Sequence, residues 1–113
     1  GVLELLVRAR LVAHSRLPVG ALHTEAVEMV SARAQHAMLA RLEPLLDEAE
    51  RNVVRRGRNA NKTSVAKNAT PEQYRASTGL EALFGWLYLQ NRLQRIETLF
   101  QAIWEAYLHE KVL

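Results

Sequence analysis

The sequence predicts an all-α domain, a helical bundle around a single hydrophobic core. Apolar residues recur along most of the chain at the spacing of helices that bury one face. Hydrophobic residues make up 49% and charged residues 24% of the 113 residues, a composition typical of folded proteins. A chain of this length builds one core and is too short for two, so we expect residues 1–113 to form one domain.

The first expected helix covers residues 1–12, and the second is predicted from Leu22 to Leu42. The first begins apolar at once, with no capping residue and no initiator methionine. We therefore expect the N-terminus to be truncated within this helix. The segment Leu17–Gly20, of sequence Leu-Pro-Val-Gly, interrupts the helical pattern. The second helix is rich in alanine, and Pro44 marks its end or a kink.

A third helix is predicted from Leu45 to Arg56, with acidic residues early and arginines late, which suits the helix dipole. A long polar loop is expected over 57–69, and loops of this length are often functional. Thr70 then has the chemistry of a helix N-cap, Pro71 fits the first turn, and Gln73 completes a capping box.

Two further helices complete the expected bundle. Residues 79–90 are apolar nearly all round, which predicts a helix buried in the core. The last helix, from Leu93 to Leu108, carries an apolar stripe that serves either the core or a dimer surface.

The net charge of +3 is unevenly distributed. Residues 51–80 contain seven basic residues and one acidic residue, while the remainder is slightly acidic. Such a local excess suggests a polyanionic partner, although an ordinary solvated charged face remains an alternative. The chain has no cysteine, which excludes disulfides and zinc–thiolate sites and fits a cytoplasmic protein. No apolar run is long enough to cross a bilayer, so we expect no membrane partner.

Glu81 is the most informative candidate for chemistry. It is the only acidic residue between Glu72 and Glu97, and it stands within the most apolar segment. An ionised carboxylate in such surroundings is costly unless it is paired or binds a metal. Thr78 and Gly85, one turn away on either side, are small enough to leave room for an ion. The alternative is a buried ion pair with a nearby arginine.

Glu4 has a similar setting, because it is a lone acid among apolar residues. Arg8 lies one turn later and is a possible ion-pair partner. The pair gains functional interest only if the first helix packs beside the helix that carries Glu81.

A basic segment forms the second functional candidate. Arginines can donate to phosphate oxygens, and asparagines to sugar or phosphate. Few aromatic residues are interleaved with the basic ones, which argues against single-strand stacking and favours recognition of a duplex backbone. The residues that we expect to bind RNA are Arg55, Arg56, Arg58, Asn59, Lys62, Lys67 and Arg75.

Several segments in the same order resemble one family. Val2-Leu3-Glu4-Leu5 is similar to the end of a motif that runs Gly-Asp-Ala-Val-Tyr-Glu, and the segments 22–23 and 30–35 are similar to the helix that follows it. Val54–Ala60, of sequence Val-Arg-Arg-Gly-Arg-Asn-Ala, matches a characteristic loop motif. Tyr74–Leu89, which includes Thr-Gly-Leu-Glu-Ala, is similar to the last motif. The family is mini-ribonuclease III, a catalytic ribonuclease III domain without a double-stranded-RNA-binding domain.

This resemblance implies a homodimeric, Mg²⁺-dependent endoribonuclease, with Mn²⁺ as a possible substitute. Its substrate would be double-stranded stems of precursor ribosomal RNA, chiefly large-subunit RNA, cut to leave a 5′-phosphate and a 3′-hydroxyl. By resemblance, Glu81 is the metal-binding catalytic glutamate and Glu4 is a supporting catalytic residue. The family's catalytic aspartate would stand immediately before Gly1, so we expect the polypeptide as given to cleave poorly.

Two other functions remain open at this stage. The fold could serve as a non-catalytic module that binds double-stranded RNA. It could also be a helical protein-interaction domain whose basic segment meets an acidic partner. The sequence does not identify the organism, so a plastid stroma is an alternative to the cytoplasm.

Overall fold

The computed structural model describes residues 1–60 and 69–110. The described part of the chain is helical, with no strand, which confirms the predicted all-α class. Its elements are α1 (Val2–His14), α2 (Val19–Met29), α3 (Ala32–Leu42), the short 3₁₀ helix η1 (Glu43–Leu45), α4 (Glu48–Ala60), α5 (Pro71–Leu89) and α6 (Leu93–Glu110).

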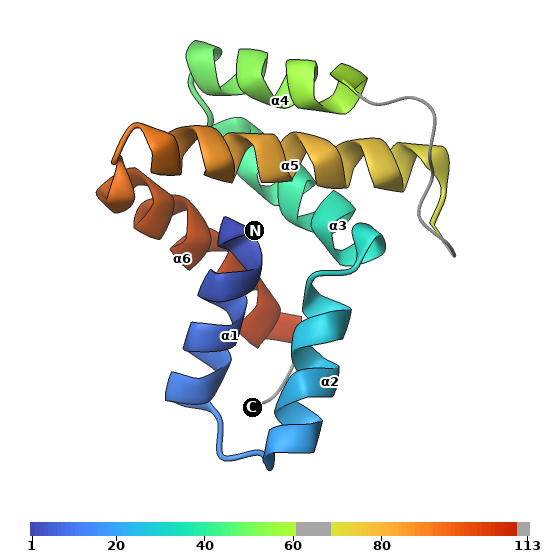
Figure 1. Cartoon of the computed structure of the whole chain (residues 1–113), viewed down its shortest axis with the longest axis vertical. Coiled ribbons are helices and arrows are strands. Elements are labelled where there is room, and N and C mark those ends of the chain that lie inside the picture. The colour runs from blue at the N-terminus through green and yellow to red at the C-terminus, as the bar shows by residue number, and fades with distance from the viewer. Residues whose placement is uncertain (61–68, 111–113) are drawn as a thin grey trace.

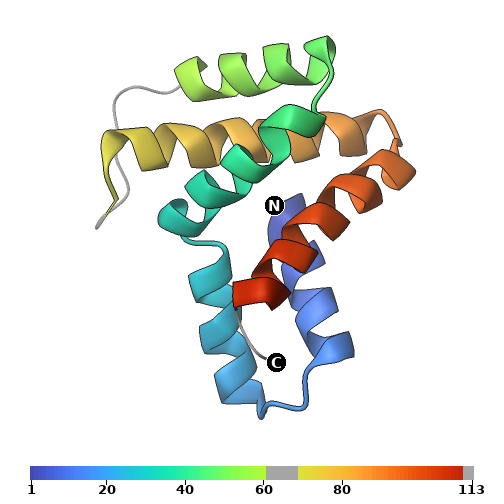
Figure 2. The same cartoon turned by 180° about the vertical axis from the view of Figure 1, so that it is seen from behind.

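Helix α5 is the centre of the bundle. In Figure 1 it runs across the molecule with α4 alongside it on the outer side, and α3 crosses behind it. Figure 2 shows the opposite face, where α3 and α6 lie nearer the viewer and α1 lies behind α6. None of the described helices is both long enough and apolar enough to span a membrane.

The hydrophobic core is built around the inner face of α5. This helix contributes Leu80, Leu83, Phe84 and Leu87, which are fully buried among side chains of α1, α3 and α6. The prediction that 79–90 is buried all round is wrong for its last turn, because Tyr88 is 57% and Leu89 is 85% exposed. The last turn of α5 therefore presents apolar side chains at the surface.

The single helix predicted from Leu22 to Leu42 is wrong, because the structure has two helices there. Ser31 adopts an extended backbone (φ −64°, ψ 157°) and its side chain accepts a hydrogen bond from the amide of Ala34, at 3.2 Å. A serine in this conformation caps a new helix, since its side chain satisfies an amide that has no partner in the first turn. Helix α2 also begins earlier than predicted, directly after Pro18.

The predicted start of the polar loop at Gly57 is also wrong. Helix α4 continues through Gly57 to Ala60, and residues 61–68 lie outside the described part. A Cβ atom at Gly57 would lie 2.6 Å from the Cβ of Ala82 and 2.9 Å from the carbonyl oxygen of Thr78. Gly57 therefore serves the close approach of α4 and α5, and not a turn.

The helix start predicted at Thr70 is confirmed. The side chain of Thr70 accepts from the amide of Gln73 at 3.0 Å, and the amide of Thr70 donates to the side chain of Gln73 at 3.1 Å. This reciprocal pair satisfies two amides that the first turn leaves without partners. It fixes where α5 begins, and therefore the turn of the helix at which Glu81 stands.

A second reciprocal cap, which the sequence did not predict, fixes the start of α4. The amide of Glu50 donates to Asp47 at 2.8 Å, and the amide of Asp47 donates to Glu50 at 2.9 Å. Arg95 of α6 donates to both carboxylate oxygens of Glu50, each at 2.8 Å, and to the carbonyl oxygen of Leu45. The fully buried Glu50 thus ties α4 to α6.

Candidate active site

The structure places Glu81 beside the N-terminal end of α1. A Cβ atom at Gly1 would lie 2.5 Å from Oε2 of Glu81 and 3.9 Å from Oε1 of Glu4. Two carboxylates from segments 77 positions apart in the sequence therefore meet at one place. The condition that gave Glu4 functional interest, packing of the first helix beside the Glu81 helix, is met.

Glu81 has no guanidinium partner. Among the described residues it makes no hydrogen bond and no ion pair, although it is partly buried. The sequence alternative, an ion pair with an arginine, is therefore not what the described part shows. A half-buried carboxylate without a protein partner is available to a cation.

The electrostatic surroundings of Glu81 also favour binding of a cation. Burial raises the pKa of Glu81 above that of an ordinary glutamate, and the negative charge of Glu4 raises it further. The N-terminal ammonium group of Gly1 acts in the opposite direction on the pKa of Glu81. A divalent cation at this place would stabilise the ionised carboxylate, because opposite charge offsets both burial and repulsion.

Glu4 is held by a different group from the one predicted. Its Oε1 accepts from the N-terminal ammonium group at 2.6 Å, and this hydrogen bond lowers the pKa of Glu4. No ion pair joins Glu4 to Arg8 within the described residues. The Nη1 atom of Arg8 is instead buried without a hydrogen-bond partner there.

The donors fit magnesium in kind, since Mg²⁺ is commonly held by one or two carboxylates together with water and phosphate oxygens. Glu81 and Glu4 would supply these two carboxylates. No group of three or more acidic, histidine or cysteine side chains converges in residues 1–60 and 69–110.

Gly85 and Thr78, the two small residues one turn from Glu81, differ in whether they leave space for an ion. A Cβ atom at Gly85 would meet no heavy atom within 4 Å, so the space predicted on this side is present. The hydroxyl of Thr78 instead donates to the carbonyl oxygens of Gly57 at 3.0 Å and of Arg75 at 2.9 Å. Thr78 therefore joins α5 to α4, and its hydroxyl is not directed to a cation at Glu81.

The predicted RNA-binding residues lie on and beside α4, wherever the structure describes them. Arg55, Arg56 and Asn59 are exposed on this helix, and Arg55 donates to the side chain of Asn52. Lys62 and Lys67 fall outside the described residues. Three of the seven predicted residues thus form an exposed basic and polar face of α4.

Arg58 and Arg75 meet at a residue that the sequence reasoning missed. Both donate to Glu72, Arg58 to Oε1 and Arg75 to Oε2, the latter at 3.3 Å. The hydrogen bond from Arg58 is the largest cause of the lowered pKa of Glu72. The available signal was that Glu72 is the only acid in a strongly basic segment, one turn before Arg75.

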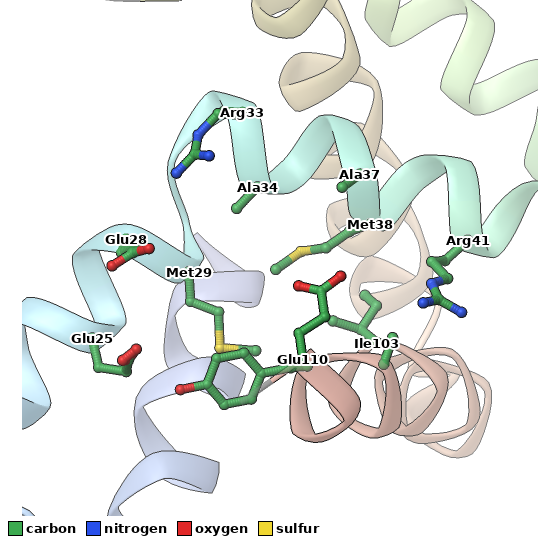
Figure 3. A pocket seen from close by; sticks show the side chains of 12 residues that line it. Glu25, Glu28, Met29, Arg33, Ala34, Ala37, Met38, Arg41, Ile103 and Glu110 are labelled. Atoms are coloured by element: carbon green, nitrogen blue, oxygen red, sulfur yellow. The ribbon is translucent and has the colours of Figure 1, made fainter. Parts of the chain in front are cut away.

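A separate cavity lies away from these carboxylates. A cavity of about 240 Å³ opens between α2, α3 and α6, and Figure 3 shows Met29 and Met38 inside it with Glu25, Glu28 and Glu110 around them. None of its lining residues is a predicted site residue. The candidate active site is therefore identified by its carboxylates and not by the shape of a pocket.

Comparison with known proteins decides the family. The ribonuclease III domain family matches residues 1–92. The mini-ribonuclease 3 of Symbiobacterium thermophilum is 46% identical over 99 residues, which cover 88% of this chain and 76% of that protein. The mini-ribonuclease 3 of Streptococcus pneumoniae is 39% identical over 100 residues, which cover 87% of this chain and 78% of that protein.

The chain belongs to the mini-ribonuclease III family.

The fold of this ribonuclease III domain is also found in a solved structure. A crystal structure of a protein from Fusobacterium nucleatum superposes with a TM-score of 0.84 at 23% identity, covering 95% of this chain and 85% of that one. The family match includes α1, α4 and α5, so it covers Glu4, Glu81 and the basic face of α4. The predicted family and fold are thereby confirmed.

Proposed function

We propose that this domain is an endoribonuclease that hydrolyses phosphodiester bonds in double-stranded stems of precursor ribosomal RNA. The observation that supports this most directly is the half-buried carboxylate of Glu81. It has no hydrogen-bond or ion-pair partner among residues 1–60 and 69–110, and it lies beside Glu4 at the N-terminal end of α1. The ribonuclease III match and the mini-ribonuclease 3 relatives support this choice of reaction. The choice of ribosomal RNA rests on the motif resemblance alone.

The cofactor that we propose is Mg²⁺, with Mn²⁺ as a possible substitute, held by Glu81 and supported by Glu4. When bound, the ion would offset the negative charge that develops on the phosphate oxygens and make water a better nucleophile. Glu81 must be ionised to do this, and the positive charge of a bound cation would lower its raised pKa. Glu4 adds negative charge beside the same place.

The basic face of α4 supports a duplex substrate. Arg55, Arg56 and Asn59 are spaced along one helix, and fixed guanidinium groups can each meet a phosphate of a regular backbone. Contacts to phosphate position a duplex without reading its bases. Helix α5 packs against both α4 and α1 and so links the basic face of α4 to the carboxylates. An RNA strand bound on α4 could thereby reach the carboxylates.

We also propose that the enzyme is a homodimer. An apolar surface hollow beside Gly1 is lined by residues that include Leu5, Tyr88 and Leu93. Leu5 is 72% exposed and Leu89, at the end of α5, is 85% exposed. Contiguous exposed apolar residues of this kind commonly mark protein interfaces. Because Gly1 lines the hollow, a two-fold interface on this surface would lie beside the acidic site of each copy.

The deciding experiment replaces Glu81 by glutamine. We expect Glu81→Gln to abolish Mg²⁺-dependent cleavage of a long RNA duplex without weakening binding of the duplex, because only the carboxylate charge is removed. Glu105→Gln makes the same change on the exposed side of α6 and should leave cleavage intact. Both variants are made in the full-length natural protein, and the 113-residue polypeptide is assayed beside it.

The outcomes separate the candidate functions. Binding without cleavage in the full-length natural protein would support a non-catalytic RNA-binding module. Cleavage that survives Glu81→Gln would refute the role of this carboxylate. Absence of both binding and cleavage at moderate salt would refute an RNA-directed function altogether.

A further inference from the structure

The arginines Arg58 and Arg75 stand on different helices but act at one place. The aliphatic stem of Arg58 lies on Gly79, where a Cβ atom would come within 2.9 Å of its Cγ. From there the guanidinium group reaches Glu72, which lies two helical turns earlier on α5. Arg75, one turn after Glu72, donates to the other carboxylate oxygen. A single carboxylate thus bridges α4 and α5.

The geometry of this cluster matches that of a bound phosphate. Two guanidinium groups that donate to the two oxygens of one carboxylate can donate in the same way to two phosphate oxygens. Each of the three side chains remains between 29% and 48% exposed, so the cluster is open to an approaching ligand. Both arginines also lower the pKa of Glu72, so the carboxylate is ionised at neutral pH.

We propose that Arg58 and Arg75 form one phosphate-binding site across α4 and α5, and that Glu72 occupies this site in the free enzyme. This inference rests on the proposed function, because it assigns the ligand as a phosphate of the RNA backbone. The substrate must displace Glu72 from both arginines before it can contact them. Glu72 therefore lowers the affinity for RNA and restricts the site to ligands that approach both guanidinium groups.

Replacing Glu72 should therefore increase the affinity for RNA, an effect that general damage to the protein would not produce. Glu72→Gln removes the internal competitor and its repulsion of phosphate, while the amide keeps the size of the side chain. We expect duplex affinity to rise about three- to tenfold, because the RNA no longer has to break two weak, exposed ion pairs before it binds. The background is Glu81→Gln, so that the duplex remains intact during measurement.

Two controls distinguish local competition from a change in net charge. Glu105→Gln alters the net charge equally but lies on α6, and it should change duplex affinity much less. Combining Glu72→Gln with Arg58→Gln tests whether Glu72 acts through this arginine. If it does, most of the gain from Glu72→Gln disappears in the double variant, because neighbouring groups are not additive.

The measurement is fluorescence anisotropy of a labelled blunt RNA duplex at fixed salt, with circular dichroism to show that each variant is folded. A gain from Glu72→Gln that is no larger than that from Glu105→Gln would overturn the inference. So would a gain that persists undiminished beside Arg58→Gln. If the duplex binds no variant at all, the proposed function fails and the inference fails with it, whereas normal binding without the local gain removes the inference alone.

Discussion

The close approach of α4 and α5 at Gly57 gives a prediction whose size follows from the structure. A methyl group at Gly57 would lie 2.6 Å from the Cβ of Ala82, 2.9 Å from the carbonyl oxygen of Thr78 and 3.0 Å from the Cα of Gly79. None of these atoms can rotate away, so Gly57→Ala must push the two helices apart. Overpacking of this kind costs about 1–3 kcal/mol.

Two smaller terms act in opposite directions. Separation of the helices would weaken the hydrogen bond from Thr78 to the carbonyl oxygen of Gly57, worth about 1 kcal/mol. Alanine is a better helix former than glycine by about 1 kcal/mol, which offsets that loss. Gly57→Ala should therefore lower the free energy of unfolding by about 1–3 kcal/mol in total.

The matched control is Gly85→Ala, in the interior of α5. A Cβ atom there would meet nothing within 4 Å, so only the gain in helix propensity remains. We expect this variant to be more stable than the wild type by about 0.5–1 kcal/mol. Gly20→Ala, on α2, is a second control with open space. Urea unfolding followed by circular dichroism measures all three. A Gly57→Ala protein as stable as Gly85→Ala would refute the steric reasoning.

Three further predictions concern the ion pair, the acidic site and the apolar surface. Glu50→Gln should lower the free energy of unfolding by about 3 kcal/mol, because it leaves the partly buried Arg95 without its charge partner. Because the pKa of Glu50 is lowered, the ion pair contributes its full stability above the ordinary glutamate pKa, and this stability is lost as the pH falls through the lowered pKa. In urea unfolding at acidic pH, the stability of the variant should therefore depend less on pH than that of the wild type. The raised pKa of Glu81 predicts that the cleavage rate falls on acidification with a midpoint above the ordinary glutamate pKa. A higher Mg²⁺ concentration should shift this midpoint to lower pH. A pH–rate profile that does not change with Mg²⁺ concentration would contradict the prediction. Leu89→Glu should dissociate the proposed homodimer in sedimentation analysis, whereas Glu105→Gln should not. A monomeric wild type would refute the homodimer.

Local sequence signals predicted a large part of the fold. The Thr70 cap, the break near Pro18 and the apolar periodicity of α1 and α6 are properties of neighbouring residues, and the structure confirms them. The lone acid Glu81 was also visible, because a charge within an apolar segment is costly wherever that segment packs. The break at Ser31 was available as a local signal too, but the alanine-rich pattern around it outweighed a single capping residue.

The sequence by itself determined most of the helical segments, which family they match and which carboxylate stands in apolar surroundings. Only the tertiary structure decided that Gly57 is a contact between helices, that Glu50 is tied to Arg95, and that Glu72 holds Arg58. These pairs lie 14 to 45 positions apart in the chain. Their meeting depends on how α4 and α6 are placed around the rest of the bundle. Periodicity and propensity describe one helix at a time, and the placement of helices is set by the packing of side chains across them.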